Sequence, residues 1–380
     1  MKKTIYYWAP FLTYVATIKA VVNSASCLER YSNTYKCKII NSVGEWDFIY
    51  TKNVEKIRIS SFNLFKFLPK FGYILSRLSF FTIFAFSFFS LKKLINRKKP
   101  DFLIVHLITS LPLLLLLIFN FETKFILRIS GFPRINFFRR ILWKMVSKKI
   151  FAVTAPTKDI YNMILKLNIF DSRKISVLYD PVFEVKDALF KNNENLSTDR
   201  FNPNNKFILS IGRFTRQKNF TLLVQAFADI IKKHPNYRLI ILGEGEEETV
   251  IKKIINDNNL DDKVFLEGRV KNVYPYFKIA DCFILTSLWE DPGFVLIESA
   301  LLNTIVISSD CPTGPKEILD EGKYGYLFRS NDKEDLLRVF SEYSNDNLQN
   351  VYRKKVNLKK NVNKFSIFKH YISLNKILNR

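Results

Sequence analysis

The sequence predicts an α/β protein with two doubly wound, parallel-sheet domains. Three observations lead to this fold class. Strand-like apolar runs alternate with helical ones, a polar Asn-rich segment divides the chain, and 380 residues exceed what one hydrophobic core usually supports. Strands that alternate with helices form βαβ units, and such units form parallel sheets. Ligands of these folds bind beyond the carboxyl ends of the strands.

The first half of the chain contains six apolar runs that are typical of strands. They are KKTIYYWAP, YKCKIINSV, DFLIVHLI, KFILRISG, IFAVTAPT and ISVLYDP. The polar segment 191–206, KNNENLSTDRFNPNNK, follows them. It predicts a linker between a first domain, 1–190, and a second domain, 207–364.

The second half repeats the alternation more clearly. Its strand-like runs are KFILSIG, YRLIILG, KVFLEG, DCFILTS and TIVISSD, and helical runs such as FTLLVQAFADIIKKH and EEETVIKKIINDN lie between them. In the first of these helices the apolar residues recur at helical spacing and form one stripe. This pattern favours a second parallel sheet.

Two apolar stretches raise the question of a membrane span. Residues 78–91 are uncharged but are fewer than the roughly 20 residues that a bilayer requires. Residues 102–121 are long enough, yet His106 and Pro112 interrupt them. We predict a buried strand followed by a helix there, with a membrane span as the alternative.

Composition indicates the class of partner and the compartment. The 59 Lys and Arg residues exceed the 35 Asp and Glu residues, and the net charge of +24 favours an anionic partner: nucleotide, nucleic acid or anionic membrane. Four cysteines without CxxC spacing fit a reducing cytoplasm. The basic start of the chain has an apolar run broken by Pro10 and Lys19, which predicts a strand and a helix of the mature domain.

The positive charge is concentrated between Glu122 and Asp159, where the sequence has no acidic residue. Aromatic and aliphatic residues alternate there with Lys124, Arg128, Arg134, Arg139, Arg140, Lys144, Lys148, Lys149 and Lys158. A basic helix with aromatic residues suits an anionic membrane surface. Nucleic acid is the rival partner, but no nucleic-acid-binding motif accompanies the segment, so we expect a membrane and no nucleic acid.

Two strand ends in the second half carry groups suited to a phosphorylated ligand. The turn GRFTRQKN, residues 212–219, places Gly212, Arg213 and Lys218 before a helix, where cations and backbone N–H groups favour a diphosphate. The alternative is a solvated basic loop. The GxG of LGEGEEE is a weaker signal that fits either a close approach of the backbone to a ligand or a simple tight turn.

The stretch SLWEDPGFVLIESALLN follows the strand DCFILTS and contains Glu290 and Glu298. Gly293 allows a tight turn, after which Phe294 and Val295 would begin a helix whose first N–H groups can bind an anion. A carboxylate accepts hydrogen bonds from vicinal hydroxyls, so the two acids suit a ribose and a sugar. The alternative is a capping acid and a surface acid.

Together these motifs resemble the C-terminal half of retaining glycosyltransferases of family 4, which have the GT-B fold: two Rossmann-like domains that face a cleft. The resemblance extends in order over about residues 206–345. It includes GRFTRQKN, LGEGEE, FLEGRVKNV, ADCFILTSLWEDPGFVLIESA, SSDCPTGPKEIL and GKYGYLF, and the spacing of Glu290 and Glu298 matches the family's E-x7-E motif.

The resemblance implies roles for the matched residues. Arg213 and Lys218 would bind the donor diphosphate, Glu298 the nucleotide ribose, and Glu290 would be a catalytic residue near the donor sugar. The segment after FLEG would line the base pocket, which implicates Arg269 and Val270. The last helix, 365–380, would cross back to the first domain.

The first domain departs from the family pattern. The loop after its first strand, WAPFLTYVATIK, lacks the glycines that many relatives have there. His106 occupies the place of a frequent cleft histidine and could orient an acceptor oxygen as a second catalytic residue. A buried structural histidine is the alternative.

The resemblance also implies a reaction and a location. The enzyme would transfer a hexose or N-acetylhexosamine from a nucleotide diphosphate sugar, such as a UDP-sugar, to a glycan acceptor. That acceptor would be lipid-linked, in surface polysaccharide synthesis such as that of O-antigen or capsule. The protein would be cytoplasmic and peripheral to the inner face of the cytoplasmic membrane. No acidic DxD pair follows a strand, so we expect fixed cations to replace a metal and no cofactor to be needed.

Two other function classes remain as alternatives. A sugar-nucleotide epimerase could share the fold, although it would need more acid and base groups in the cleft than the sequence offers. A basic membrane-surface scaffold would explain the charge but would have no use for Arg213, Lys218 and the paired glutamates. Acceptor-dependent release of nucleoside diphosphate separates the three.

Overall fold

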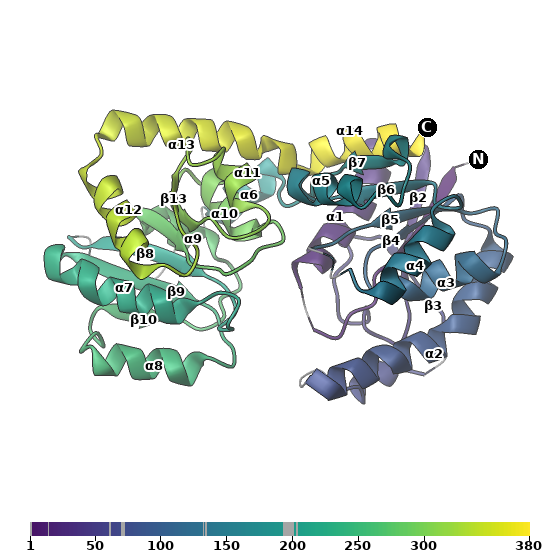
Figure 1. Cartoon of the computed structure of the whole chain (residues 1–380), viewed down its shortest axis with the longest axis horizontal. Coiled ribbons are helices and arrows are strands. Elements are labelled where there is room, and N and C mark those ends of the chain that lie inside the picture. Colours follow the sequence, from purple (N-terminus) through teal and green to yellow (C-terminus); the bar gives the residue numbers. More distant parts are fainter. Residues whose placement is uncertain are drawn as a thin grey trace. The chain divides into compact units, whose positions relative to one another are not determined.

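The computed structural model confirms the predicted α/β class and divides the chain into two compact units (Figure 1). It describes residues 2–13, 15–60, 62–69, 73–131, 133, 135–192, 201–202 and 204–380. Unit 1 comprises Met1–Val182 and Ile367–Arg380, and unit 2 comprises Phe183–Ser366. The final helix therefore belongs to unit 1.

The first unit ends at Val182, before position 190, where the sequence predicts the end of the first domain. Helix α6 (Val185–Asn192) packs against α9 (Tyr274–Ile279) and so belongs to unit 2. Of the predicted linker 191–206, residues 193–200 and 203 lie outside the described residues.

Unit 1 contains a parallel sheet with the strand order β3-β2-β1-β4-β5-β6-β7. Its strands are β1 (Lys3–Trp8), β2 (Tyr35–Asn41), β3 (Glu55–Arg58), β4 (Phe102–Val105), β5 (Lys124–Arg128), β6 (Ala152–Ala155) and β7 (Ile175–Val177). Its helices are α1 (Ala16–Tyr31), α2 (Tyr73–Lys98), α3 (Ser110–Ile118), α4 (Phe137–Val146), α5 (Lys158–Lys166) and α14 (Ile367–Leu378), with 3₁₀ turns η1 (Leu64–Lys66) and η2 (Ser172–Lys174). Strand order reverses between β1 and β4.

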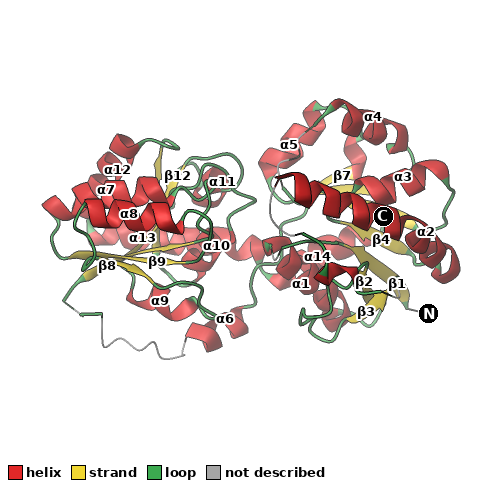
Figure 2. Ribbon diagram, turned by 90° about the horizontal axis from the view of Figure 1, so that it is seen from below, coloured by secondary structure: helices red, strands yellow, loops and turns green. Residues whose placement is uncertain are grey.

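The two faces of this sheet carry separate cores. Helices α1 and α14 cover one face, and α2, α3, α4 and α5 contribute to the core on the other (Figure 2). A buried chain of hydrogen bonds links the first face: Tyr7 Oη lies 3.0 Å from Ser24 Oγ, which lies 2.8 Å from His370 Nε2. His370 Nδ1 donates to the carbonyl of Tyr179 at 2.6 Å. These contacts hold the final helix on the sheet.

The two apolar stretches form different structures. Residues 102–121 form buried β4 and the mostly buried α3, which confirms the predicted strand and helix. The stretch 78–91 lies within the longer helix α2, which continues past Arg77 and Lys92 and has 26 residues. By length and composition alone α2 qualifies as a membrane span, and only 22% of its most apolar window is buried. A length estimate based on 78–91 was therefore too short.

Unit 2 contains a second parallel sheet with the order β10-β9-β8-β11-β12-β13. Its strands are β8 (Lys206–Ile211), β9 (Tyr237–Leu242), β10 (Val264–Leu266), β11 (Cys282–Leu285), β12 (Ile305–Ser309) and β13 (Tyr326–Phe328). Its other helices are α7 (Phe220–Lys233), α8 (Glu248–Asp257), α10 (Phe294–Leu301), α11 (Pro315–Leu319), α12 (Lys333–Asn345) and α13 (Leu348–Val362), with the 3₁₀ turn η3 (Asn363–Phe365). Strand order reverses between β8 and β11, where doubly wound folds bind ligands.

Candidate active site

Three loops meet at the carboxyl edge of the unit 2 sheet. They follow β8, β11 and β12, which are neighbours around the point where strand order reverses. Thr286 Oγ1 donates to the carbonyls of Lys218 and Asn219 at 3.0 Å, and Leu288 N donates to Gln217 O at 2.8 Å. These bonds hold the loop after β11 against the loop after β8.

Glu290 lies at the centre of these loops. Its carboxylate forms an ion pair with Lys218 Nζ and accepts a hydrogen bond from Ser287 Oγ at 2.6 Å. Its backbone carbonyl accepts from Thr313 Oγ1, and its N–H donates to Pro312 O at 3.2 Å. Glu290 is 5% exposed, so its charge has little water and depends on these partners.

The Lys218 side chain is 14% exposed in this pair. It therefore does not extend into solvent, as a lysine of a solvated basic loop would. A buried cation that already has a carboxylate partner is held in one position.

Glycines allow the loops to approach so closely. Gly243, with φ +150°, follows β9, and a Cβ there would come 1.8 Å from the carbonyl oxygen of Gly212. A Cβ at Gly245 would come 2.4 Å from Phe214 O. The GxG motif therefore serves a close backbone approach to the loop after β8.

Helix α10 begins at the same edge. Its N-cap Gly293 has φ +93°, a conformation that glycine adopts without strain, and Phe294 and Val295 form the first turn. A Cβ at Gly293 would lie 3.6 Å from Glu290 Cγ, so the turn and the carboxylate are adjacent. Glu298, in the second turn, is 8% exposed. The structure thus places both predicted acids at one edge, and both are buried, which disfavours a surface acid.

Three predicted residues, Arg213, Arg269 and Val270, lie in the loops after β8 and β10. Arg213 is exposed in the loop after β8. Arg269 Nη1 lies 3.6 Å from Glu244 Oε1 in an exposed ion pair, and Val270 beside it is half-buried. Because Gly243 N donates to Gly268 O at 2.8 Å, the loops after β9 and β10 are also joined.

His106 belongs to unit 1. It follows β4, and its N–H donates to Trp8 O at 2.9 Å, so it lies where the strand order of unit 1 reverses. Burial, together with the nearby Arg128 and His370, holds the pKa of His106 well below its usual value. The imidazole is therefore neutral, and its Nδ1 lies 3.5 Å from Ser130 Oγ.

The structure divides the basic segment 122–159. Arg128 is buried at 2% exposure and forms an ion pair with Asp180 at 2.6 Å, so it is structural and not part of a basic surface. Lys149 Nζ donates to the carbonyls of Leu116 and Leu117 at 3.0 and 3.2 Å. Arg139, Arg140, Lys144 and Lys148 are at least partly exposed, and Arg134 lies outside the described residues.

Several site residues carried no separate signal in the sequence. Ser287, Pro312 and Thr313 contact Glu290, and a Cβ at Gly314 would come 2.0 Å from the carbonyl oxygen of Pro292. They lie in two of the family-like segments, ADCFILTSLWEDPGFVLIESA and SSDCPTGPKEIL, but no individual role was predicted for them. Within the described part of the chain, no three His, Cys, Asp or Glu side chains gather as a metal site.

Comparison with known proteins identifies the family. The model of the family described as glycosyl transferases group 1 matches residues 192–365. An uncharacterized glycosyltransferase of Methanocaldococcus jannaschii is 30% identical over 288 residues, which are 67% of this chain and 70% of that relative. The chain belongs to the group 1 glycosyltransferases. The matched segment contains the whole unit 2 edge described above.

Other similar proteins agree with this family. A Campylobacter jejuni relative, an N-acetylgalactosamine-N,N'-diacetylbacillosaminyl-diphospho-undecaprenol 4-alpha-N-acetylgalactosaminyltransferase, is 25% identical over 62% of this chain and 65% of its own length. A glycosyltransferase structure from Rickettsia africae superposes with a TM-score of 0.79 at 17% identity, covering 99% of this chain and 98% of that one. HepE from Anabaena, in complex with UDP and glucose, superposes with a TM-score of 0.74 at 14% identity over 99% of both chains. These likenesses show the GT-B fold.

Proposed function

We propose that the protein is a retaining, family 4 glycosyltransferase that transfers a hexose or N-acetylhexosamine from a UDP-sugar to a lipid-linked glycan acceptor in surface polysaccharide synthesis. The observation that carries the proposal is the buried pair of Lys218 and Glu290 beside the Gly293 turn. A positioned cation, a carboxylate and a helix N-terminus at one strand edge suit a sugar diphosphate.

In this proposal the donor lies along the unit 2 edge. Lys218, Arg213 and the N–H groups of Phe294 and Val295 bind the diphosphate, with Gly212 allowing it to approach the backbone. Glu298 accepts hydrogen bonds from the ribose, and Arg269 with Val270 contacts the base. The UDP in the HepE structure is the reason to choose uridine as the first nucleotide to test.

The proposed chemistry transfers the sugar with retention. An acceptor hydroxyl attacks the anomeric carbon on the face from which the diphosphate departs. The new carbon–oxygen bond forms as the bond to phosphate breaks, and the leaving diphosphate takes the hydroxyl proton. Lys218, Arg213 and the α10 N-terminus stabilise the negative charge on the leaving group, so no metal or further cofactor is needed. Glu290 fixes Lys218 and accepts a hydrogen bond from the donor sugar.

Unit 1 is proposed to supply the acceptor site. The neutral imidazole of His106 would orient an acceptor oxygen by a hydrogen bond. The name of the Campylobacter relative includes a diphospho-undecaprenol acceptor, which supports a lipid-linked glycan as the acceptor to test. We infer a cytoplasmic protein peripheral to the inner face of the membrane, attracted by Arg139, Arg140, Lys144 and Lys148.

The test is a transfer assay with separated donor and acceptor. Purified protein is incubated with UDP-sugars, with and without undecaprenyl-diphosphate glycans, and UDP release is followed together with the mass and anomeric configuration of the product. We expect UDP release only with acceptor, and a retained configuration. Sugar interconversion without UDP release would indicate an epimerase instead, and no conversion of any donor would leave only a scaffold.

A further inference from the structure

Helix α2 has its apolar side outward. Its buried stripe consists of Ser79, Ile83, Ser87, Leu91 and Ile95, so two of five inward positions are serines. Between residues 74 and 89 its exposed side chains, apart from Arg77 and Ala85, are large and apolar: Ile74, Leu75, Leu78, Phe80, Phe81, Phe86 and Phe89, which are 40% to 78% exposed. A helix that faces water has the opposite distribution. The outward face is therefore suited to an apolar environment.

Polar and apolar contacts fix α2 to unit 1 along its length. Ser79 Oγ donates to Pro69 O at 2.7 Å, and Ser87 Oγ shares a hydrogen bond with Ser42 Oγ in the loop after β2. Leu91 and Ile95 are part of the core that covers the sheet. A helix held in this way lies on the sheet and does not cross a bilayer, although it is long enough to do so.

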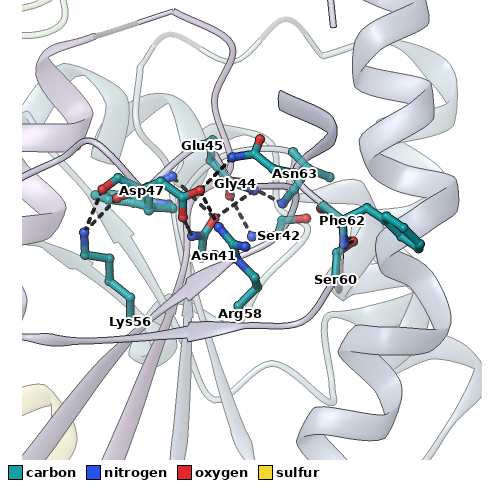
Figure 3. A network of polar contacts seen from close by, with 12 residues as sticks. Asn41, Ser42, Gly44, Glu45, Asp47, Lys56, Arg58, Ser60, Phe62 and Asn63 are labelled. Atoms are coloured by element: carbon teal, nitrogen blue, oxygen red, sulfur yellow. Dashed lines mark hydrogen bonds and ion pairs between the residues drawn. The ribbon is translucent and has the colours of Figure 1, made fainter. Parts of the chain in front are cut away.

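Asn41, Asp47, Arg58 and Asn63, which precede α2 in the chain, form a network of polar contacts (Figure 3). Asp47 accepts hydrogen bonds from Asn41 and Asn63, each at 2.7 Å, and forms an ion pair with Arg58. Next to this network, Phe62 and Phe67 are 75% and 83% exposed. Both rings are therefore exposed in the segment that precedes α2.

Charge indicates what covers this face. Between Glu55 and Asp101 the sequence has no acidic residue but has Lys56, Arg58, Lys66, Lys70, Arg77, Lys92, Lys93, Arg97, Lys98 and Lys99. Helix α2 contacts α3, and α3 contacts α4, whose Phe137, Phe138 and Met145 are exposed among Arg139, Arg140 and Lys144. Apolar side chains among cations suit a membrane surface, because the apolar groups can contact acyl chains while the cations contact anionic headgroups.

We propose that α2, together with Phe62 and Phe67, inserts into the surface of an anionic lipid bilayer with its axis in the membrane plane. The aromatic face enters the acyl boundary, and the cations at the helix end contact headgroups. This inference deepens the proposed membrane location. It rests on the proposed function only in that a lipid-linked acceptor would explain why the enzyme binds a membrane. Insertion of apolar side chains, unlike attraction by charge alone, persists in high salt.

The test compares two sets of exposed apolar residues. Phe81, Phe86 and Phe89 are changed to Ser together, and the matched control changes Leu348 and Tyr352 of unit 2, which are 87% and 69% exposed. Binding to vesicles of phosphatidylcholine with 30% phosphatidylglycerol is measured by sedimentation in 0.1 and 0.5 M NaCl. We expect the parent and the control to bind in both, and the triple variant to bind on the order of 100-fold more weakly.

A second measurement reports how deeply the α2 side chains enter the bilayer. Tryptophan placed by Phe86→Trp should be quenched by lipids brominated in the acyl chains, whereas Leu348→Trp should not. The proposal is overturned if the triple variant binds vesicles as tightly as the parent. It is also overturned if neither protein binds vesicles and the parent is a dimer whereas the triple variant is a monomer. Resistance of the parent to alkaline carbonate extraction would also overturn it in favour of a span. UDP affinity, measured in parallel, reports on the proposed transferase function independently.

Discussion

The buried His370 predicts a specific loss of stability in mild acid. His370 is 4% exposed, and burial lowers its pKa from 6.5 to about 3. A group whose pKa is lower in the folded state than in the unfolded state takes up protons on unfolding. Its contribution to stability is complete above pH 6.5 and is lost as pH falls from 6.5 towards 3.

The magnitude follows from the two pKa values. At pH 5 the unfolded histidine is almost fully protonated and the folded one is almost fully neutral, which destabilises unit 1 by about 2 kcal/mol relative to pH 7.5. For a unit of this size the melting temperature falls by roughly 4 to 8 °C. His370→Asn removes this contribution, so the variant should lose less stability than the parent over the same pH change.

Tryptophan fluorescence is the assay, because Trp8, Trp46 and Trp143 belong to unit 1 and only Trp289 belongs to unit 2. Melting is recorded at pH 7.5 and 5.0 for the parent, His370→Asn and the control His234→Asn, which lies in unit 2. We expect the acid-induced decrease to be smaller in His370→Asn alone. An equal decrease in the parent and in His370→Asn would refute the reasoning.

Four further outcomes are expected. Gly243→Ala should weaken UDP binding at least tenfold, because its Cβ would meet Gly212 O at 1.8 Å. Gly322→Ala, also at positive φ but with room for a Cβ, should not weaken it. Equal UDP affinities of the two variants would contradict the proposed loop contact. Glu298→Ala should bind UDP roughly 10- to 100-fold more weakly, and only the parent should discriminate UDP from its 2′,3′-dideoxy analogue, if the carboxylate binds the ribose. Transfer should continue in excess EDTA, and loss of activity that Mg²⁺ or Mn²⁺ restores would count against fixed cations. Neutralising Arg139, Arg140, Lys144 and Lys148 together should weaken vesicle binding most at low salt and leave UDP binding intact; unchanged vesicle binding would remove them from the membrane surface.

Much of the fold could be predicted from the sequence, because parallel strands buried on both faces are continuously apolar. Strand β3 was missed: its sequence EKIR is polar, and it lies at the edge of the sheet with exposed ends. The length of α2 was underestimated because Arg77 and Lys92 interrupt the apolar run but do not end the helix. Single charges mark neither the end of a helix nor the side that it exposes.

The site was predictable only in part. Glu290, Lys218 and Gly293 stood out because acids, cations and glycines at strand ends suggest chemistry. Ser287 and Thr313 did not, since their role arises when three loops from distant strands meet. Arg128 was misplaced on the basic surface because a charge-rich run does not show which cation turns inward.

The central claim is that unit 2 binds a nucleotide diphosphate through Arg213 and Lys218. Titration calorimetry with UDP tests it most directly, on the parent, Arg213→Ala, Lys218→Ala and the control Lys232→Ala, an exposed lysine of α7. We predict that UDP binds the parent and the control equally, and that each loop variant binds roughly 10- to 100-fold more weakly while its melting curve shows it to be folded. Unchanged UDP affinity in both loop variants would contradict the account.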